Sequence, residues 1–164
     1  MSTAEFRKLR ALGRQIDQEI RGAPRNLELF DDIENSVSAM EVQASRFQGM
    51  FLQAESFIDQ LQKESLMDAL SLDAVAAMFE KTRDTVADFY ALNATQRQSV
   101  VDDERISGDK CIVDCYDVLL TTLASLHNSL NSIAFLVGEQ LAETDKVAPG
   151  EFTSADALFT AMGI

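Results

Sequence analysis

The chain is poor in the residues that make turns and interrupt helices. Its 164 residues include 7 glycines and 2 prolines. No stretch alternates apolar and polar residues for long enough to indicate a β-strand, and no internal repeat or low-complexity segment is present. These shortages favour an all-α fold, and the length suits one domain with a hydrophobic core.

Side chains that ligate metals or act as nucleophiles are also scarce. The single histidine, His127, is followed by Asn128-Ser129-Leu130-Asn131, whereas histidine phosphotransfer domains follow theirs with a Leu-Lys-Gly pattern; we expect a core histidine. Cys111 and Cys115 share one helix face but have no further ligands to complete a zinc site. A diiron bundle would need Glu-x-x-His pairs. We therefore expect no metal and no cofactor, and two small residues in or near the core in a reducing cytoplasm.

Basic residues are outnumbered, with 14 Lys and Arg against 27 Asp and Glu, for a net charge of −13. A surface this acidic repels nucleic acid and anionic membranes, so neither is an expected partner. The longest uncharged run, Val118 to Gly138, holds many hydroxyl and amide side chains and indicates a bundle helix rather than a membrane span. No secretory signal is apparent at the N-terminus, so a cytoplasmic location is expected.

What the sequence has in abundance is apolar residues at alternating steps of three and four. From Phe30 to Leu61 this spacing continues for more than four heptads, as in helices that pack lengthwise against others. We predict a helix from about Leu27 to Glu64, roughly 57 Å long at about 1.5 Å per residue. Its seam consists of Phe30, Ile33, Val37, Met40, Ala44, Phe47, Phe51, Ala54, Ile58 and Leu61.

Three other segments show the same spacing and are predicted helices. They run from about Thr3 to Arg21, from a cap at Ser71 or Asp73 to about Arg105, and from about Asp109 to Glu143. A bend near Asn93 is an alternative for the third predicted helix. With the helix at 27–64, these segments predict an elongated antiparallel bundle of four helices over residues 1–143.

The last long helix carries no charge between Asp117 and Glu139, so either other helices or a second chain should surround it. One edge is small and polar and would permit close approach of another helix. We expect a homodimer interface on that edge, which consists of Thr121, Ser125, Ser129 and Ser132.

Residues 144–152 contain Pro149 and Gly150 and are predicted to be a linker, followed by a short amphipathic helix at 153–164. This helix resembles the C-terminal peptide of CheZ-type chemotaxis phosphatases. That peptide has an acid, any residue, two large apolar residues, two more residues, then Leu-Gly-Phe. The matching positions are Asp156, Leu158, Phe159, Met162, Gly163 and Ile164, with Met for Leu and Ile for the final Phe.

The Asp-Ala-Leu-Phe core is also similar to the Asp-Ala-Leu-Leu of the flagellar switch protein FliM, and both family peptides dock on the response regulator CheY. The resemblance, which covers about a dozen residues, implies a chemotaxis or two-component signalling protein. It would bind a CheY-like receiver domain through 153–164, as an adaptor or a divergent phosphatase. A helix that packs back on its own bundle would give a similar pattern. A different class, an acidic inhibitor or immunity protein of a basic toxin, is the alternative suggested by the net charge.

CheZ-type phosphatases use an acid followed four residues later by Gln, which orients the attacking water. No glutamine of this chain has Asp or Glu four residues before it. Asp32 and Asn35 form the acid-x-x-Asn spacing of other CheY phosphatases. The resemblance therefore implies a docking segment and leaves enzymatic activity open.

Overall fold

The computed structural model describes residues 3–23, 33–63, 69–103 and 110–147. They form α1 (Thr3–Gly22), α2 (Ile33–Lys63), α3 (Ala69–Asp102) and α4 (Lys110–Val147). No strand occurs in these ranges. The all-α helical bundle predicted from the sequence is confirmed.

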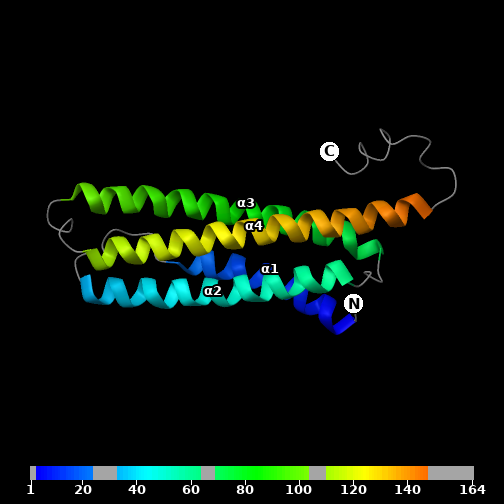
Figure 1. Cartoon of the computed structure of the whole chain (residues 1–164), viewed down its shortest axis with the longest axis horizontal. Coiled ribbons are helices and arrows are strands. Elements are labelled where there is room, and N and C mark those ends of the chain that lie inside the picture. The colour runs from blue at the N-terminus through cyan, green and yellow to red at the C-terminus, as the bar shows by residue number, and fades with distance from the viewer. Residues whose placement is uncertain (1–2, 24–32, 64–68, 104–109, 148–164) are drawn as a thin grey trace.

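The helices lie side by side, and each runs opposite to the one before it in the chain (Figure 1). At about 1.5 Å per residue, α2, α3 and α4 are rods of about 46, 51 and 57 Å. Helix α4 packs along both α2 and α3, while the shorter α1 packs against parts of the same two helices. The first two turns of α1 and the C-terminal end of α4 lie toward the same end of the bundle (Figure 1).

The predicted seams form the core. On α4, every seam residue is at most 3 % exposed, and these residues are Ile112, Tyr116, Leu119, Leu123, Leu126, Leu130, Ile133 and Val137. On α2, Phe47 is fully buried and its ring packs against that of Phe89 of α3, with centroids 5.8 Å apart. Val37, Phe51 and Ile58 of the same α2 seam are half-buried.

Helix α1 follows the same rule on a smaller scale. Leu9, Leu12, Ile16 and Ile20 are at most 2 % exposed and face the other helices. Gly13 lies among them, and a methyl group placed on its Cα would lie 3.0 Å from Cε of Met78 on α3. The glycine therefore lets α1 approach α3 closely, at the expense of helix propensity.

Some boundaries differ from those predicted. Helix α3 passes through Asn93, which is buried and donates its side-chain N–H to the Phe89 carbonyl at 2.8 Å, and it ends at Asp102 rather than near Arg105. Helix α4 continues to Val147, so residues 144–147, placed in the linker from the sequence, are helical. The chain 24–32, with the expected start of the second helix, lies outside the described residues.

None of the described helices combines the length and hydropathy needed to cross a bilayer.

Candidate functional site

The docking residues predicted from the sequence lie outside the described part of the chain. Asp156, Leu158, Phe159, Met162, Gly163 and Ile164 all belong to 148–164. The same is true of Asp32 and of the Asn35 side chain, which formed the acid-x-x-Asn pair. What the structure shows is the bundle from which this segment follows, with three surface features that could contact a partner.

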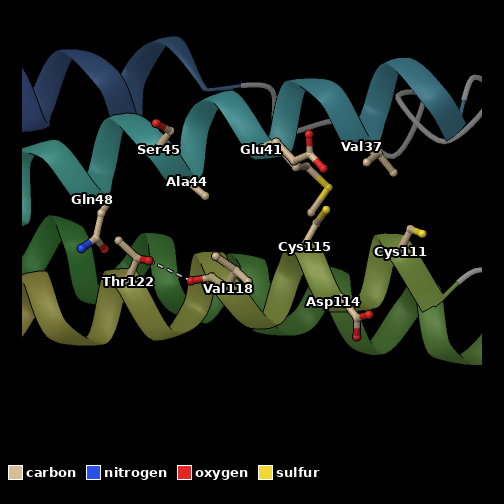
Figure 2. A pocket seen from close by; sticks show the side chains of 11 residues that line it. Val37, Glu41, Ala44, Ser45, Gln48, Cys111, Asp114, Cys115, Val118 and Thr122 are labelled. Atoms are coloured by element: carbon tan, nitrogen blue, oxygen red, sulfur yellow. Dashed lines mark hydrogen bonds between the residues drawn. The ribbon is translucent and has the colours of Figure 1, made fainter.

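The first feature is a groove between α2 and α4, with a volume of about 650 Å³ (Figure 2). It lies beside a small core cluster that joins Met40 of α2 to Val100 of α3 and to Ile112 and Tyr116 of α4. The residues that line it are Val37, Met40, Glu41, Ala44, Ser45, Gln48, Cys111, Asp114, Cys115, Val118 and Thr122.

Side-chain size explains the groove. Ala44 and Ser45 of α2 and Cys111 and Cys115 of α4 contribute to its lining, and all four are smaller than the leucines that fill the core elsewhere. The rim carries Glu41 from α2 and Asp114 from α4 (Figure 2). An apolar floor with an acidic rim suits apolar side chains flanked by neutral or basic groups.

The two cysteines are thiols rather than a disulfide, with Cys111 exposed and Cys115 half-buried. Cys115 thus lies at the edge of the core, as expected from the sequence, whereas the expectation was wrong for the exposed Cys111. Across the described ranges, no three His, Cys, Asp or Glu side chains gather closely enough to hold a metal ion. His127, expected in the core, is half-buried on α4.

Tyr116 closes one end of the core beside this groove. It is 3 % exposed and donates its hydroxyl to Oε1 of Gln96 at 3.2 Å. Burial raises the pKa of the Tyr116 hydroxyl from 10.0 to about 12, because the phenolate would lose its hydration.

We expect this burial to make the fold sensitive to alkali. Between pH 10 and 12 the unfolded chain releases the Tyr116 proton while the folded chain retains it, so the unfolded state binds fewer protons and stability falls as pH rises. Allowing for solvent screening, the loss is about 1–2 kcal/mol. Urea unfolding at pH 9 and near pH 11.5, compared with Tyr116→Phe, measures it. An equal alkaline loss in both chains would contradict the assignment.

The second feature is the outer face of α4, which the sequence predicted to be surrounded. Val118 and Phe135 are 57 % and 56 % exposed, so the other helices that the structure describes do not cover these side chains. The predicted polar edge is divided. Thr121 and Ser132 are exposed, whereas Ser129 is buried and donates to Oε1 of Glu55 on α2 at 2.6 Å. Including Ser129 in an exposed dimer edge was therefore wrong, because α2 already occupies that side. A homodimer through the remaining residues stays a prediction.

The third feature, which sequence reasoning missed, is a basic face on α1. Arg7, Lys8, Arg10, Arg14 and Arg21 are all exposed. Arg7, Arg10, Arg14 and Arg21 recur at steps of three, four and seven, so they share one stripe on the side away from the buried leucines and isoleucines, with the half-buried Asp17 between Arg14 and Arg21. The spacing is present in the sequence, but the large net negative charge of the whole chain conceals the local excess of positive charge.

The charge is thus divided along the chain. Residues 1–25 carry six of the 14 basic and three of the 27 acidic side chains, a net charge of +3. The remaining residues, 26–164, carry eight basic and 24 acidic side chains, a net charge of −16. A partner can therefore meet either sign of potential on this molecule.

The chain matches no protein-family model, no curated protein and no solved structure.

Proposed function

We propose that this protein is a helical signalling adaptor that binds a CheY-type receiver domain through residues 153–164. The pattern of that segment carries the proposal. An acid at Asp156 precedes Leu158, Phe159 and Met162, which would share one face of a short helix before Gly163-Ile164. Such a helix can lay its apolar face in a groove of a receiver, with Asp156 next to basic residues at the rim.

The long bundle supports the adaptor role. Helix α4 ends at Val147, and residues 148–152 separate it from the docking segment. Five residues span at most about 17 Å, so a receiver held by 153–164 stays near this end of the bundle. The short connection raises the effective concentration of one surface around the other, without requiring catalysis.

The first test is binding of the intact chain, and of a chain stopped after Gly150, to the CheY-type receivers encoded in the same genome. Isothermal titration should detect binding only with the intact chain, while the helical circular dichroism of residues 3–147 is retained. The two single variants, Leu158→Ala and Phe159→Ala, should each weaken binding about tenfold or more, as expected for apolar anchors of a docked helix. Phe135→Ala, which truncates an exposed phenylalanine of α4, is the matched control and should bind normally.

Undiminished binding by the chain stopped after Gly150 would contradict the docking role. Timing the dephosphorylation of a phosphorylated receiver with and without the intact chain separates an adaptor from a phosphatase. An unchanged rate is the result expected of an adaptor.

A second candidate function rests on the −16 charge of residues 26–164. An inhibitor of a basic toxin would use this acidic surface and would associate rapidly, with strong dependence on salt. The chain stopped after Gly150 distinguishes the two functions, because an acidic inhibitor would keep its activity without residues 153–164.

A further inference from the structure

The basic face of α1 is the feature that the receiver-binding proposal does not use. Its five cations, Arg7, Lys8, Arg10, Arg14 and Arg21, lie on a helix whose apolar side is fully occupied by the bundle. Within the described residues none of the five forms an ion pair, although the chain has nearly twice as many acidic as basic side chains.

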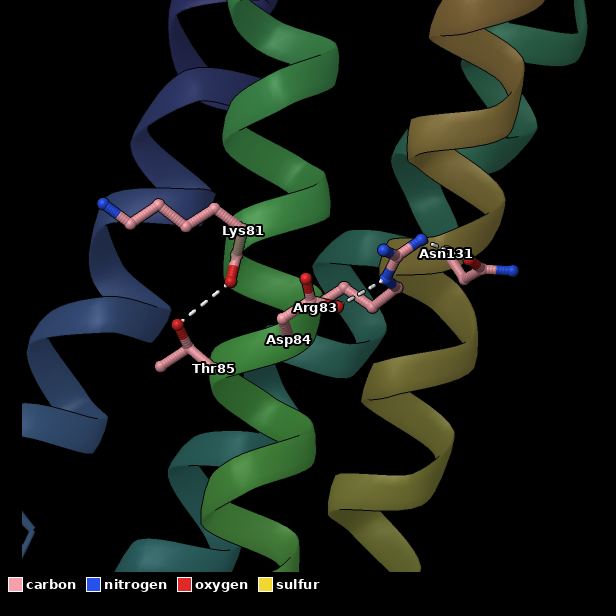
Figure 3. Close-up of polar contacts among 5 residues, drawn as sticks. All are labelled: Lys81, Arg83, Asp84, Thr85 and Asn131. Atoms are coloured by element: carbon pink, nitrogen blue, oxygen red, sulfur yellow. Dashed lines mark hydrogen bonds and ion pairs between the residues drawn. The ribbon is translucent and has the colours of Figure 1, made fainter. Parts of the chain in front are cut away.

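Other described cations behave differently. Arg46 pairs with Glu19, Arg97 with Asp117, and Lys63 with Asp59. Arg83 pairs with Asp84 and also donates to Oδ1 of Asn131 across α3 and α4 (Figure 3). These side chains bind within and between the helices of the bundle, whereas the cations of the α1 face are left to solvent.

A neighbouring cation on α3 extends the face. Lys81 is exposed, and Figure 3 shows its side chain on the α1 side of α3, opposite the side from which Arg83 reaches Asn131 of α4. Met78, one turn earlier on α3, contacts α1 at Gly13. The basic face therefore crosses from α1 to the adjoining edge of α3.

We propose that the basic face binds an acidic surface of the same receiver domain that residues 153–164 capture; this rests on the proposed function. The stripe from Arg7 to Arg21 is about 21 Å long, at about 1.5 Å per residue. That length suits a compact acidic face of a folded domain. Arginine pairs with carboxylates through two parallel hydrogen bonds, which gives orientation as well as attraction.

The surroundings of the basic face favour a compact partner over an extended polyanion. Asp73, Glu80, Asp84 and Asp88 are exposed along α3, the helix beside α1. A long nucleic acid or a flat anionic membrane would extend beyond the arginines onto these carboxylates and be repelled. A folded domain can contact the arginines without covering the carboxylates of α3.

The position along the bundle links the two contacts. Arg7, Lys8 and Arg10 are in the first turns of α1, which lie toward the same end of the bundle as the end of α4 (Figure 1). The connection 148–152 reaches about 17 Å, close to the width of two packed helices. A receiver anchored by 153–164 is thereby held within reach of the basic face. Apolar anchoring then sets the dissociation rate, and the arginines raise the association rate and orient the receiver.

The test measures association and dissociation rates of the full chain and a CheY-type receiver by stopped flow at low and physiological salt. The triple variant Arg7→Gln, Arg10→Gln and Arg14→Gln removes three charges. The matched control, Ala124→Glu, Asn128→Asp and Asn131→Asp, changes the net charge equally on the exposed face of α4 and leaves the predicted dimer edge untouched. Circular dichroism and urea unfolding confirm that both variants fold.

The arginine variant is expected to associate about tenfold more slowly at low salt and to lose most of the salt dependence, with a dissociation rate within about threefold of the original. The α4 control should change the association rate less than threefold. Equal slowing by both variants would mean that net charge acts alone, and no slowing by the arginine variant would mean that the face makes no contact. Either result overturns the inference while the receiver-binding function stands.

Two further results bear on the choice of partner. Absence of receiver binding by the intact chain overturns both the function and this inference. Binding of the chain to phosphatidylserine vesicles or to duplex DNA at physiological salt, lost in the arginine variant, would assign the basic face to a polyanion instead.

Discussion

Phe47→Ala is expected to lower the free energy of unfolding by about 3–5 kcal/mol. Phe47 is fully buried at the centre of the α2 seam, and its ring packs against Phe89 with an interplanar angle of 41°. Truncation removes buried apolar surface from the centre of the core and leaves a cavity that long rigid helices cannot readily collapse. Urea or guanidinium unfolding followed by circular dichroism at 222 nm measures the change.

The chain offers a matched control for this prediction. Phe135→Ala makes the same chemical change on the outer face of α4, where the side chain is 56 % exposed, and should shift stability by less than about 0.5 kcal/mol. Similar losses for the two variants would mean that Phe135 is covered in solution. In that case the loss at Phe135 should depend on protein concentration, as a homodimer through α4 requires.

Gly13→Leu is expected to destabilise the fold by about 1–3 kcal/mol through overpacking between α1 and α3. A Cβ at Gly13 would lie 3.0 Å from Cε and 3.3 Å from Sδ of Met78, and a leucine would extend further into the same space. Gly13→Ala should be close to neutral. The gain in helix propensity, about 1 kcal/mol, is offset by moving the end of the Met78 side chain.

Gly49 provides the control for the helix-propensity effect. It lies in the middle of α2 and is exposed, and beyond its chain neighbours and the backbone of its own helical turn no heavy atom lies within 4 Å of the position that a Cβ would take. Gly49→Leu should therefore raise stability by several tenths of a kcal/mol, opposite in sign to Gly13→Leu. Destabilisation of the same size at both positions would argue against close packing of α1 on α3.

The division of charge changes how the acidic composition is interpreted. A net charge of −13 suggested a basic partner, yet the five cations of the α1 face lie on the surface without ion pairs in the described part of the chain. Summing the charges hid this segregation, because the 24 acidic residues of 26–164 outweigh it. The net charge of each predicted helix, counted separately, would have revealed the basic face.

Several features of the fold followed from the sequence because they depend on local periodicity. Steps of three and four placed Leu119, Leu123, Leu126 and Leu130 on one side of a helix, and all four are at most 1 % exposed. An apolar stripe of that length has few ways to leave water other than packing against parallel or antiparallel rods. Helix number, helix order and most of the core were therefore predictable, and the docking pattern at 153–164 was visible as a prediction.

The tertiary structure alone decided which helices are neighbours, and that choice determined the surfaces. The uncharged run of α4 did not indicate that Ser129 would donate a hydrogen bond to Glu55 of α2. It also did not indicate that Phe135 would face outward. Likewise, the local pattern did not predict that Gly13 would lie against Met78, or that a groove would lie beside Cys115. Periodicity specifies which face of a helix is buried; the side chains of other helices, distant in sequence, specify what fills the space against it and what remains exposed.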